Sequence, residues 1–151
     1  MDLRITRGHL QVLALAITGA LVLSCGNEGE VQPVPGSINV LGTPASRGLI
    51  EQGAALYVGN CQVCHGGATG GKLRDIPPPH NAKGHTWDHA DQQIIEMTLN
   101  GISFSLEKQR MPAFKDKLSE DDVKAILAYI KTWWTEDQRT QQQKVTEEWR
   151  R

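Results

Sequence analysis

The residues best suited to chemistry in this sequence are two cysteines and a histidine that lie close together, Cys61, Cys64 and His65. Two thiols separated by two residues have the reach to bond the two vinyl groups on one edge of a porphyrin. A histidine directly after the second thiol then falls under the iron and can ligate it. The spacing therefore predicts one haem c, bonded covalently through Cys61 and Cys64, with His65 as an axial ligand of the iron.

Closely spaced cysteines also occur in other kinds of site. A structural zinc site needs four protein ligands, often from two such cysteine pairs, and the sequence has no second pair. A thioredoxin-like dithiol expects strands alternating with helices, whereas the segments around this motif have helical patterns. A separate hypothesis is copper or zinc binding by the crowded histidines His80, His85 and His89, although exposed loop histidines are the simpler interpretation.

The opposite face of the iron needs a second ligand if the haem is to be six-coordinate. Of the three methionines, Met1 leaves with an export signal and Met97 sits in the middle of an expected helix, where a core role is favoured. Met111 lies 46 residues after His65 and directly before Pro112, which favours an extended loop over a helix. A loop can present a thioether to iron, so Met111 is the expected second ligand, with one of the three crowded histidines as the alternative.

The N-terminus has the pattern of an export signal. Arg4 and Arg7 precede a mostly apolar run of 14 residues, 10–23, which is too short for a membrane span and suits a signal peptide. The run ends at Ser24-Cys25, which resembles a bacterial lipoprotein box, so we expect a signal peptide over residues 1–24 and lipidation of Cys25. An uncleaved anchor and simple secretion are the alternatives, and all three place the rest of the chain outside the cytoplasm, at a membrane on the periplasmic side if Cys25 is lipidated.

The remaining chain is expected to form a flexible linker over residues 25–46, a compact domain over 47–135 and a polar tail over 136–151 that can form one more exposed helix. The linker is rich in proline and glycine and lacks a helical or strand period. Thr43 is expected to cap a first helix that runs to Gly59. A middle helix should end at Asn100-Gly101. No run alternates like a strand, so the domain is predicted to be all-α.

Two further helix starts are expected near the C-terminus. Ser119 and Asp122 have the spacing of a capping box, and Thr135 with Gln138 repeats it. After the first of these starts, apolar residues recur at helical spacing, which predicts the best-buried face of the domain. That face comprises Val123, Ile126, Leu127, Ile130 and Trp134.

These features together resemble a class I cytochrome c of the small bacterial kind. The resemblance covers roughly residues 47–134 and rests on Gly53-x-x-x-Tyr57, CQVCH, MPAF, LSEDDVKAILAYIKTWW and the segment 84–101. It implies a few helices wrapped around one haem, with the first and last helices crossing near Gly53. It also implies that the carbonyl of Pro77, Pro78 or Pro79 accepts the ring N–H of His65. Trp87 is expected either to donate to a haem propionate or to pack beside the haem.

The composition is compatible with one small globular domain and argues against several other classes. The chain has 151 residues, a net charge of −1 and three cysteines, which argue for one domain without nucleic-acid binding or a disulfide scaffold. The resemblance implies an electron-transfer protein rather than an enzyme, with a membrane-associated oxidase, copper enzyme or respiratory complex as its redox partner. The alternative functions are a haem enzyme or gas-reacting haem with a labile sixth position, and the copper-binding module.

Overall fold

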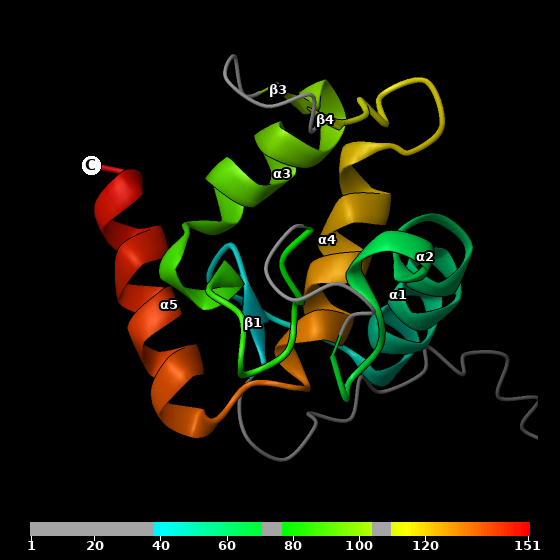
Figure 1. Ribbon diagram of the computed structural model, residues 1–151. Helices are drawn as coiled ribbons and strands as arrows, with labels where there is room; N and C mark the ends of the chain where they lie inside the picture. Colours follow the sequence, from blue (N-terminus) through cyan, green and yellow to red (C-terminus); the bar gives the residue numbers. More distant parts are fainter. Residues whose placement is uncertain (1–37, 71–76, 104–109) are drawn as a thin grey trace, which may run out of the picture. The chain divides into compact units, whose positions relative to one another are not determined.

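The computed structural model describes residues 38–70, 77–103 and 110–151. The expected signal peptide, Cys25 and the first part of the linker lie outside the described residues. The elements that follow are helical apart from two short hairpins, so the predicted all-α class is confirmed (Figure 1). In chain order they are β1 Asn39–Val40, β2 Thr43–Pro44, α1 Arg47–Asn60, α2 Gln62–His65, the 3-10 turn η1 Thr86–Asp88, α3 Asp91–Asn100, β3 Ile102–Ser103, β4 Arg110–Met111, α4 Glu120–Lys131 and α5 Glu136–Trp149.

The start of α1 differs from the prediction. Ser46 caps the helix, since its hydroxyl accepts a hydrogen bond from the backbone N–H of Leu49 at 3.1 Å. Thr43 and Pro44 instead form β2, which pairs antiparallel with β1. The turn between these strands uses positive φ angles at Leu41 and Gly42, of 52° and 80°. A leucine in that conformation gives no turn signal in the sequence, which is why the hairpin was not predicted.

The expected linker therefore extended too far toward the C-terminus. Ile38, Val40 and Ala45 are buried in the hydrophobic core, and β1 packs against α4. Burying these three apolar side chains offsets the entropy lost on ordering the segment. Residues 38–46 thus belong to the folded domain.

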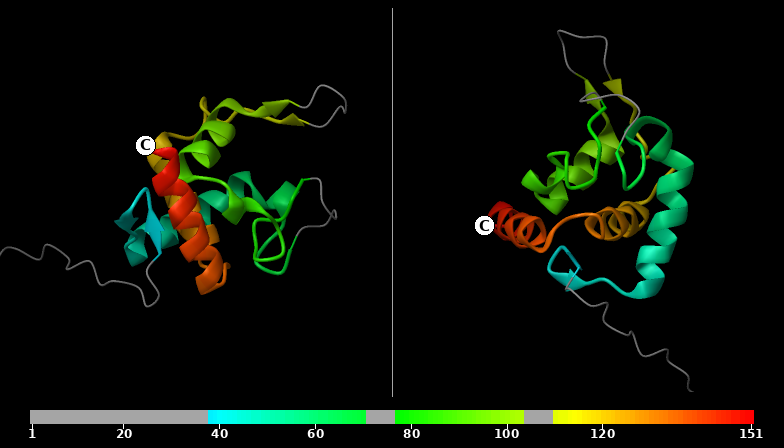
Figure 2. Two further views of the ribbon diagram at one scale, coloured as in Figure 1. Left: turned by 90° about the vertical axis from the view of Figure 1, so that its left-hand side faces the viewer. Right: turned by 60° about the horizontal axis from the view of Figure 1, so that its bottom comes forward.

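The two main helices of the core are α1 and α4, which cross as the right-hand view of Figure 2 shows. The predicted capping box begins α4, because Ser119 Oγ accepts from the Asp122 backbone N–H and the Asp122 carboxylate accepts from the Ser119 backbone N–H. The five apolar residues expected on this face are all buried, each at 6% exposure or less, although Trp134 lies just beyond the last residue of α4. The crossing and the buried face confirm the arrangement expected from the sequence.

The C-terminal segment expected as a polar tail is the helix α5, and one side of it is part of the domain. Thr135 and Gln138 form the predicted capping box. The helix packs against η1 and α3 and buries Gln142 and Thr146, which are 1% and 2% exposed. Polar side chains line this contact, which explains why a search for apolar periodicity did not assign the segment to the core.

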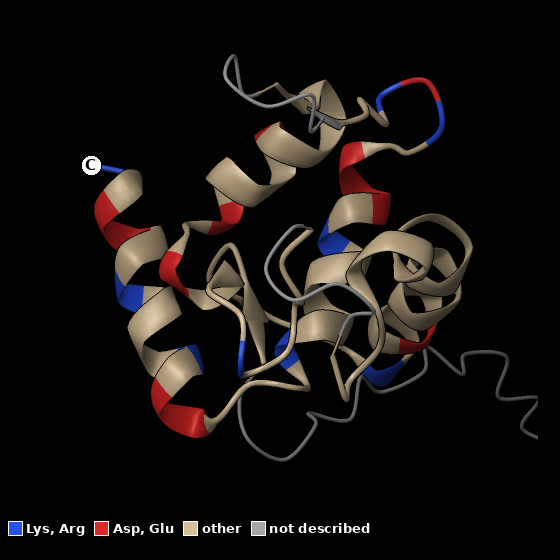
Figure 3. Ribbon diagram, viewed as in Figure 1, with Lys and Arg blue, Asp and Glu red and all other residues tan. Residues whose placement is uncertain are grey.

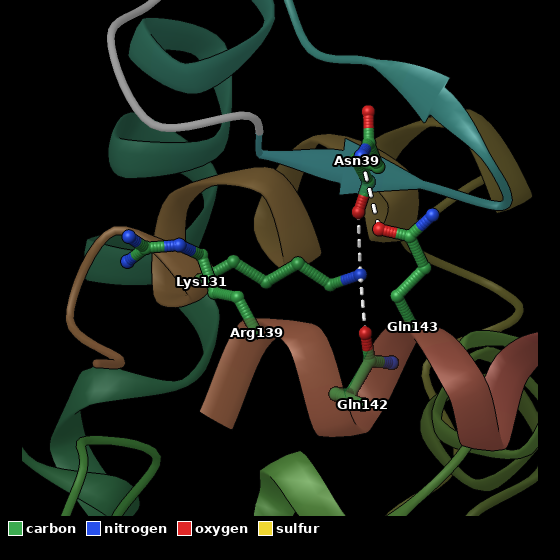
Figure 4. A pocket seen from close by; sticks show the side chains of 5 residues that line it. All are labelled: Asn39, Lys131, Arg139, Gln142 and Gln143. Carbon is green, nitrogen blue, oxygen red and sulfur yellow. Dashed lines mark hydrogen bonds between the residues drawn. The ribbon is translucent and has the colours of Figure 1, made fainter. Parts of the chain in front are cut away.

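A buried polar cluster joins α5 to the rest of the domain (Figure 4). Lys131 Nζ lies 2.7 Å from the Asp91 carboxylate, 2.9 Å from Gln142 Oε1 and 2.6 Å from the carbonyl oxygen of Asn39. The Lys131 and Asp91 side chains are only 3% and 2% exposed. Burial lowers the pKa of Lys131, and the nearby Asp91 carboxylate opposes that shift. The ion pair joins α4 to α3, and the hydrogen bonds of Lys131 to Asn39 and Gln142 add β1 and α5 to the cluster.

None of the helices in the described part of the chain has both the length and the apolar character needed to cross a membrane.

Candidate haem site

The two cysteines lie within one turn of helical backbone at the end of α1. The N–H of Cys61 donates to the carbonyl of Tyr57 at 2.8 Å, and the N–H of His65 donates to the carbonyl of Cys61 at 3.0 Å. Cys61 is buried and Cys64 exposed, and both are free thiols. Burial raises the pKa of Cys61 to about 11, with a smaller contribution from Cys64. Two unpaired thiols one helical turn apart, followed directly by a histidine, fit the two covalent bonds of haem c.

One ring nitrogen of His65 is hydrogen-bonded to a backbone carbonyl. Its Nδ1 lies 2.7 Å from the carbonyl oxygen of Pro78, and the side chain is buried. A carbonyl oxygen only accepts hydrogen bonds, so Nδ1 carries the proton and Nε2 keeps a lone pair for a metal. Burial lowers the pKa of His65, and the hydrogen bond to Pro78 opposes this shift. Of the three prolines that the resemblance left open, Pro78 is the one in contact.

Tyr57 supports the end of α2, the helix that carries His65. Its hydroxyl donates to the carbonyl of Gly66 at 2.8 Å, and the ring is 1% exposed. Burial, with contributions from Cys61 and Tyr129, raises the pKa of Tyr57. Edge-on aromatic contacts with Tyr129 and Trp133 of the α4 region hold the ring. The sequence pattern included Tyr57 only as part of the first helix, and this hydrogen bond was not predicted.

The backbone around Met111 is extended, as Pro112 predicted. Met111 belongs to β4 and pairs with Ile102 of β3. The end of α3 holds the chain that follows, because the N–H groups of Phe114 and Lys115 donate to the carbonyls of Thr98 and Leu99, both at 3.1 Å. These bonds satisfy carbonyls that the helix end would otherwise leave unpaired.

Gly101 allows the Met111 segment to approach the end of α3. Its φ is +77°, and a Cβ atom at this position would stand 2.7 Å from the carbonyl oxygen of Met111. The glycine that marks the predicted end of the middle helix therefore also makes room for this loop. The other internal methionine, Met97, lies within α3 and packs against the hydrophobic core, in agreement with its predicted role.

The three crowded histidines have different surroundings. His80 is stacked on His65, with ring centroids 4.1 Å apart and planes at 23°, and burial together with nearby His65 and His85 lowers the pKa of His80 to about 3. His85 is exposed and makes an edge contact with His89, whose Nδ1 lies 3.1 Å from Gln93 Oε1. No three His, Cys, Asp or Glu side chains of the described residues are grouped so as to hold a metal ion. The geometry thus gives no support to a copper site.

Trp87 uses its donor within its own loop. The indole N–H donates to the carbonyl of Gly84 at 2.9 Å, and the ring packs against the hydrophobic core. Of the two roles expected for this residue, packing is the one that these contacts support, while contact with a propionate stays a prediction.

The helical fold, two free thiols one helical turn apart and a neighbouring histidine whose Nε2 is free to bind iron define a c-type cytochrome. A family model described as cytochrome C oxidase, cbb3-type, subunit III matches residues 48–130. The chain belongs to this family of cytochrome c domains, which carry covalently bound haem c and transfer electrons.

Individual relatives agree with this assignment. The chain is 30% identical over 86 residues to cytochrome c6 of Cladophora glomerata, which is 54% of this chain and 86% of that protein. It is 28% identical over 122 residues to chloroplastic cytochrome c6 of Chlamydomonas reinhardtii, or 78% of this chain and 66% of that protein. A third relative is the quinohemoprotein alcohol dehydrogenase ADH IIB of Pseudomonas putida, at 28% identity over 87% of this chain but only 17% of the dehydrogenase. No solved structure gives a significant match.

Proposed function

We propose that this protein is a single-haem electron carrier in which Cys61 and Cys64 bond the haem and His65 and Met111 fill the two axial positions of the iron. The observation that carries the proposal is the hydrogen bond from His65 Nδ1 to Pro78, which leaves Nε2 of the residue that follows Cys64 free to bind iron. The bound haem supplies an iron that cycles between the ferrous and ferric states. The protein holds both ligands in place, so that little reorganises when one electron arrives or leaves.

The proposed ligands imply a positive reduction potential. A thioether ligand favours ferrous iron, and an apolar surrounding disfavours the additional charge of ferric iron. The core around the site is apolar and aromatic, including Tyr57, Trp133 and Tyr129. A carrier of this kind would pass electrons to an acceptor such as an oxidase, a copper enzyme or a respiratory complex.

Electrons are proposed to enter and leave near Cys64. This thiol is exposed, and so are two apolar side chains near it in the chain: Val63 is 75% exposed and Val58, on α1, is 59% exposed. No charged residue occurs between positions 52 and 71, and α2 and most of α1 carry no charge in Figure 3. An uncharged, partly apolar surface suits a brief encounter with a redox partner. Burying it releases ordered water from apolar groups and removes little water from charged groups.

The carrier is proposed to work outside the cytoplasm, tethered to a membrane through a lipid on Cys25. The charged start, apolar run and Ser24-Cys25 junction support this location. Tethering would raise the concentration of the carrier around membrane-bound partners. Replacement of Cys25 by Ala should move the protein from the membrane fraction to the soluble fraction, and a protein that stays membrane-bound would contradict lipid anchoring at this residue.

The spectrum of the ferric protein tests the proposed ligands. Sulfur ligation gives a weak charge-transfer band from sulfur to iron, and a filled sixth position prevents rapid carbon monoxide binding to the ferrous form. We expect the band to be present and carbon monoxide to bind slowly. Absence of the band together with rapid binding would favour the alternative, a haem enzyme with a labile sixth position.

A further inference from the structure

His80 is packed face to face against the proposed axial ligand. The ring centroids of His80 and His65 are 4.1 Å apart and their planes differ by 23°, which is a stacked arrangement. The two residues are separated by 15 positions in the chain. The haem motif alone does not require an aromatic ring at this place.

His80 is itself held from several directions. Its Nδ1 lies 2.8 Å from Thr86 Oγ1, and its backbone carbonyl accepts a hydrogen bond from the Trp134 indole N–H at 2.8 Å. The Tyr57 ring meets it edge-on with centroids 6.1 Å apart. Thr86 and Tyr57 therefore hold the ring and Trp134 holds its backbone, so the ring can act as a rigid surface.

A rigid surface on the face of His65 restrains small rotations of the ring that the Pro78 hydrogen bond restrains only weakly. Iron binds at Nε2, and the iron–Nε2 axis passes through the middle of the opposite Cγ–Nδ1 bond. A large turn of the imidazole plane about that axis would break the hydrogen bond from Nδ1 to Pro78, but a small turn moves Nδ1 little and keeps it. The same turn would push the edges of the His65 ring into the plane of His80. Pro78 therefore fixes the tautomer of His65 and limits the orientation of its plane coarsely, and stacking on His80 fixes that orientation within the range that remains.

We propose that His80 is a positioning residue that sets the orientation of the His65 imidazole plane at the haem iron. The proposal rests on the proposed function in one respect, that His65 ligates the iron. In ferric haem, the orientation of the axial ligand planes determines how the unpaired electron is distributed over the four haem methyl groups. His80 thus shapes the electronic structure of the carrier without touching the iron.

The test compares two substitutions in the haem-loaded ferric protein by proton NMR of the haem methyl groups. His80→Phe keeps a flat aromatic ring on His65, whereas His80→Leu fills similar space without a flat face. We expect His80→Leu to change the order or the spread of the four methyl shifts, and His80→Phe to keep the wild-type pattern. His85→Ala, which changes an exposed histidine nearby, should also keep it.

The outcomes separate the role of His80 from haem ligation. A wild-type methyl pattern in His80→Leu would overturn the proposal, as would a pattern in His80→Phe that departs as far as that in His80→Leu. If His80→Leu does not load haem, Thr86→Val is measured in its place. The His80 ring is then kept but loses its 2.8 Å hydrogen bond to Thr86, and we expect an altered methyl pattern. An unchanged pattern there would overturn the proposal. If the ferric wild-type protein shows no sulfur-to-iron band, that result would contradict only the ligation by Met111.

Discussion

Gly53 in α1 lies directly against the carbonyl group of Ala125 in α4. A Cβ atom at residue 53 would stand 1.9 Å from that oxygen and 2.5 Å from the carbonyl carbon. The two helix backbones are therefore in contact at this crossing, and the contact sets the direction in which α1 delivers Cys61 and His65 to the haem.

Gly53→Ala should destabilise the protein, because the new methyl group must push two backbones apart. Overpacking of this kind costs about 1–3 kcal/mol. Gly59→Ala is the matched control in the same helix, since a Cβ atom added there would have no other atom within 4 Å. That change should be neutral or stabilising by up to about 1 kcal/mol. Urea unfolding of the haem-loaded variants measures both, and equal effects would contradict the close crossing.

Met111→Ala should leave the haem attached but remove the sulfur-to-iron band of the ferric protein and allow rapid carbon monoxide binding to the ferrous protein. Met97→Ala is the control, because Met97 packs against the core from within α3. It should lower stability by about 2–5 kcal/mol at most and keep the band. A band that persists in Met111→Ala, or that disappears only in Met97→Ala, would show that the ligand is assigned wrongly.

Asp91→Ala should be strongly destabilising, because it leaves the Lys131 ammonium buried without its counter-charge. Loss of one partner of a buried ion pair costs about 3–5 kcal/mol. Lys124→Ala breaks the surface pairs with Glu120 and Asp121 and should cost no more than about 1 kcal/mol. Denaturant unfolding compares the two variants. A cost for Asp91→Ala as small as that for Lys124→Ala would mean that the buried cluster does not hold α5 in place.

Val63→Glu should slow electron self-exchange between ferrous and ferric copies of the protein. If two copies meet through the uncharged surface around Cys64, the substitution places like charges opposite each other. Two such charges about 4 Å apart in water cost about 1 kcal/mol, or a factor of about five in rate at low salt. NMR line broadening in mixed-oxidation samples measures the exchange rate, and added salt should restore it.

Trp149→Glu is the control for this surface, because Trp149 is also an exposed apolar residue, 53% accessible, but lies at the end of α5. It should leave the self-exchange rate unchanged. A slower rate in Trp149→Glu and not in Val63→Glu would place the exchange surface elsewhere on the molecule.

Features of the site that depend on near neighbours in the chain were predictable from the sequence. The cysteine pair with His65 forms one helical turn, and Pro112 keeps the Met111 segment extended, because both effects act within a few residues. The capping boxes at Ser119 and Thr135 are equally local.

Features that depend on distant residues were not predictable. The choice of Pro78 among three adjacent prolines, and the stacking of His80 on His65, depend on how residues 77–80 lie against α2. The contact of Lys131 with Asp91 spans 40 positions, and neither residue has a sequence signal that pairs it with the other. The hairpin before α1 was missed because its strands are two residues long and its turn begins at a leucine.

The reduction potential of the purified, haem-loaded protein tests the central claim most directly, that one haem with His65 and Met111 as ligands serves as an electron carrier. Protein-film voltammetry should show a single reversible one-electron couple at a positive potential, because thioether ligation favours ferrous iron. A strongly negative couple would contradict that account.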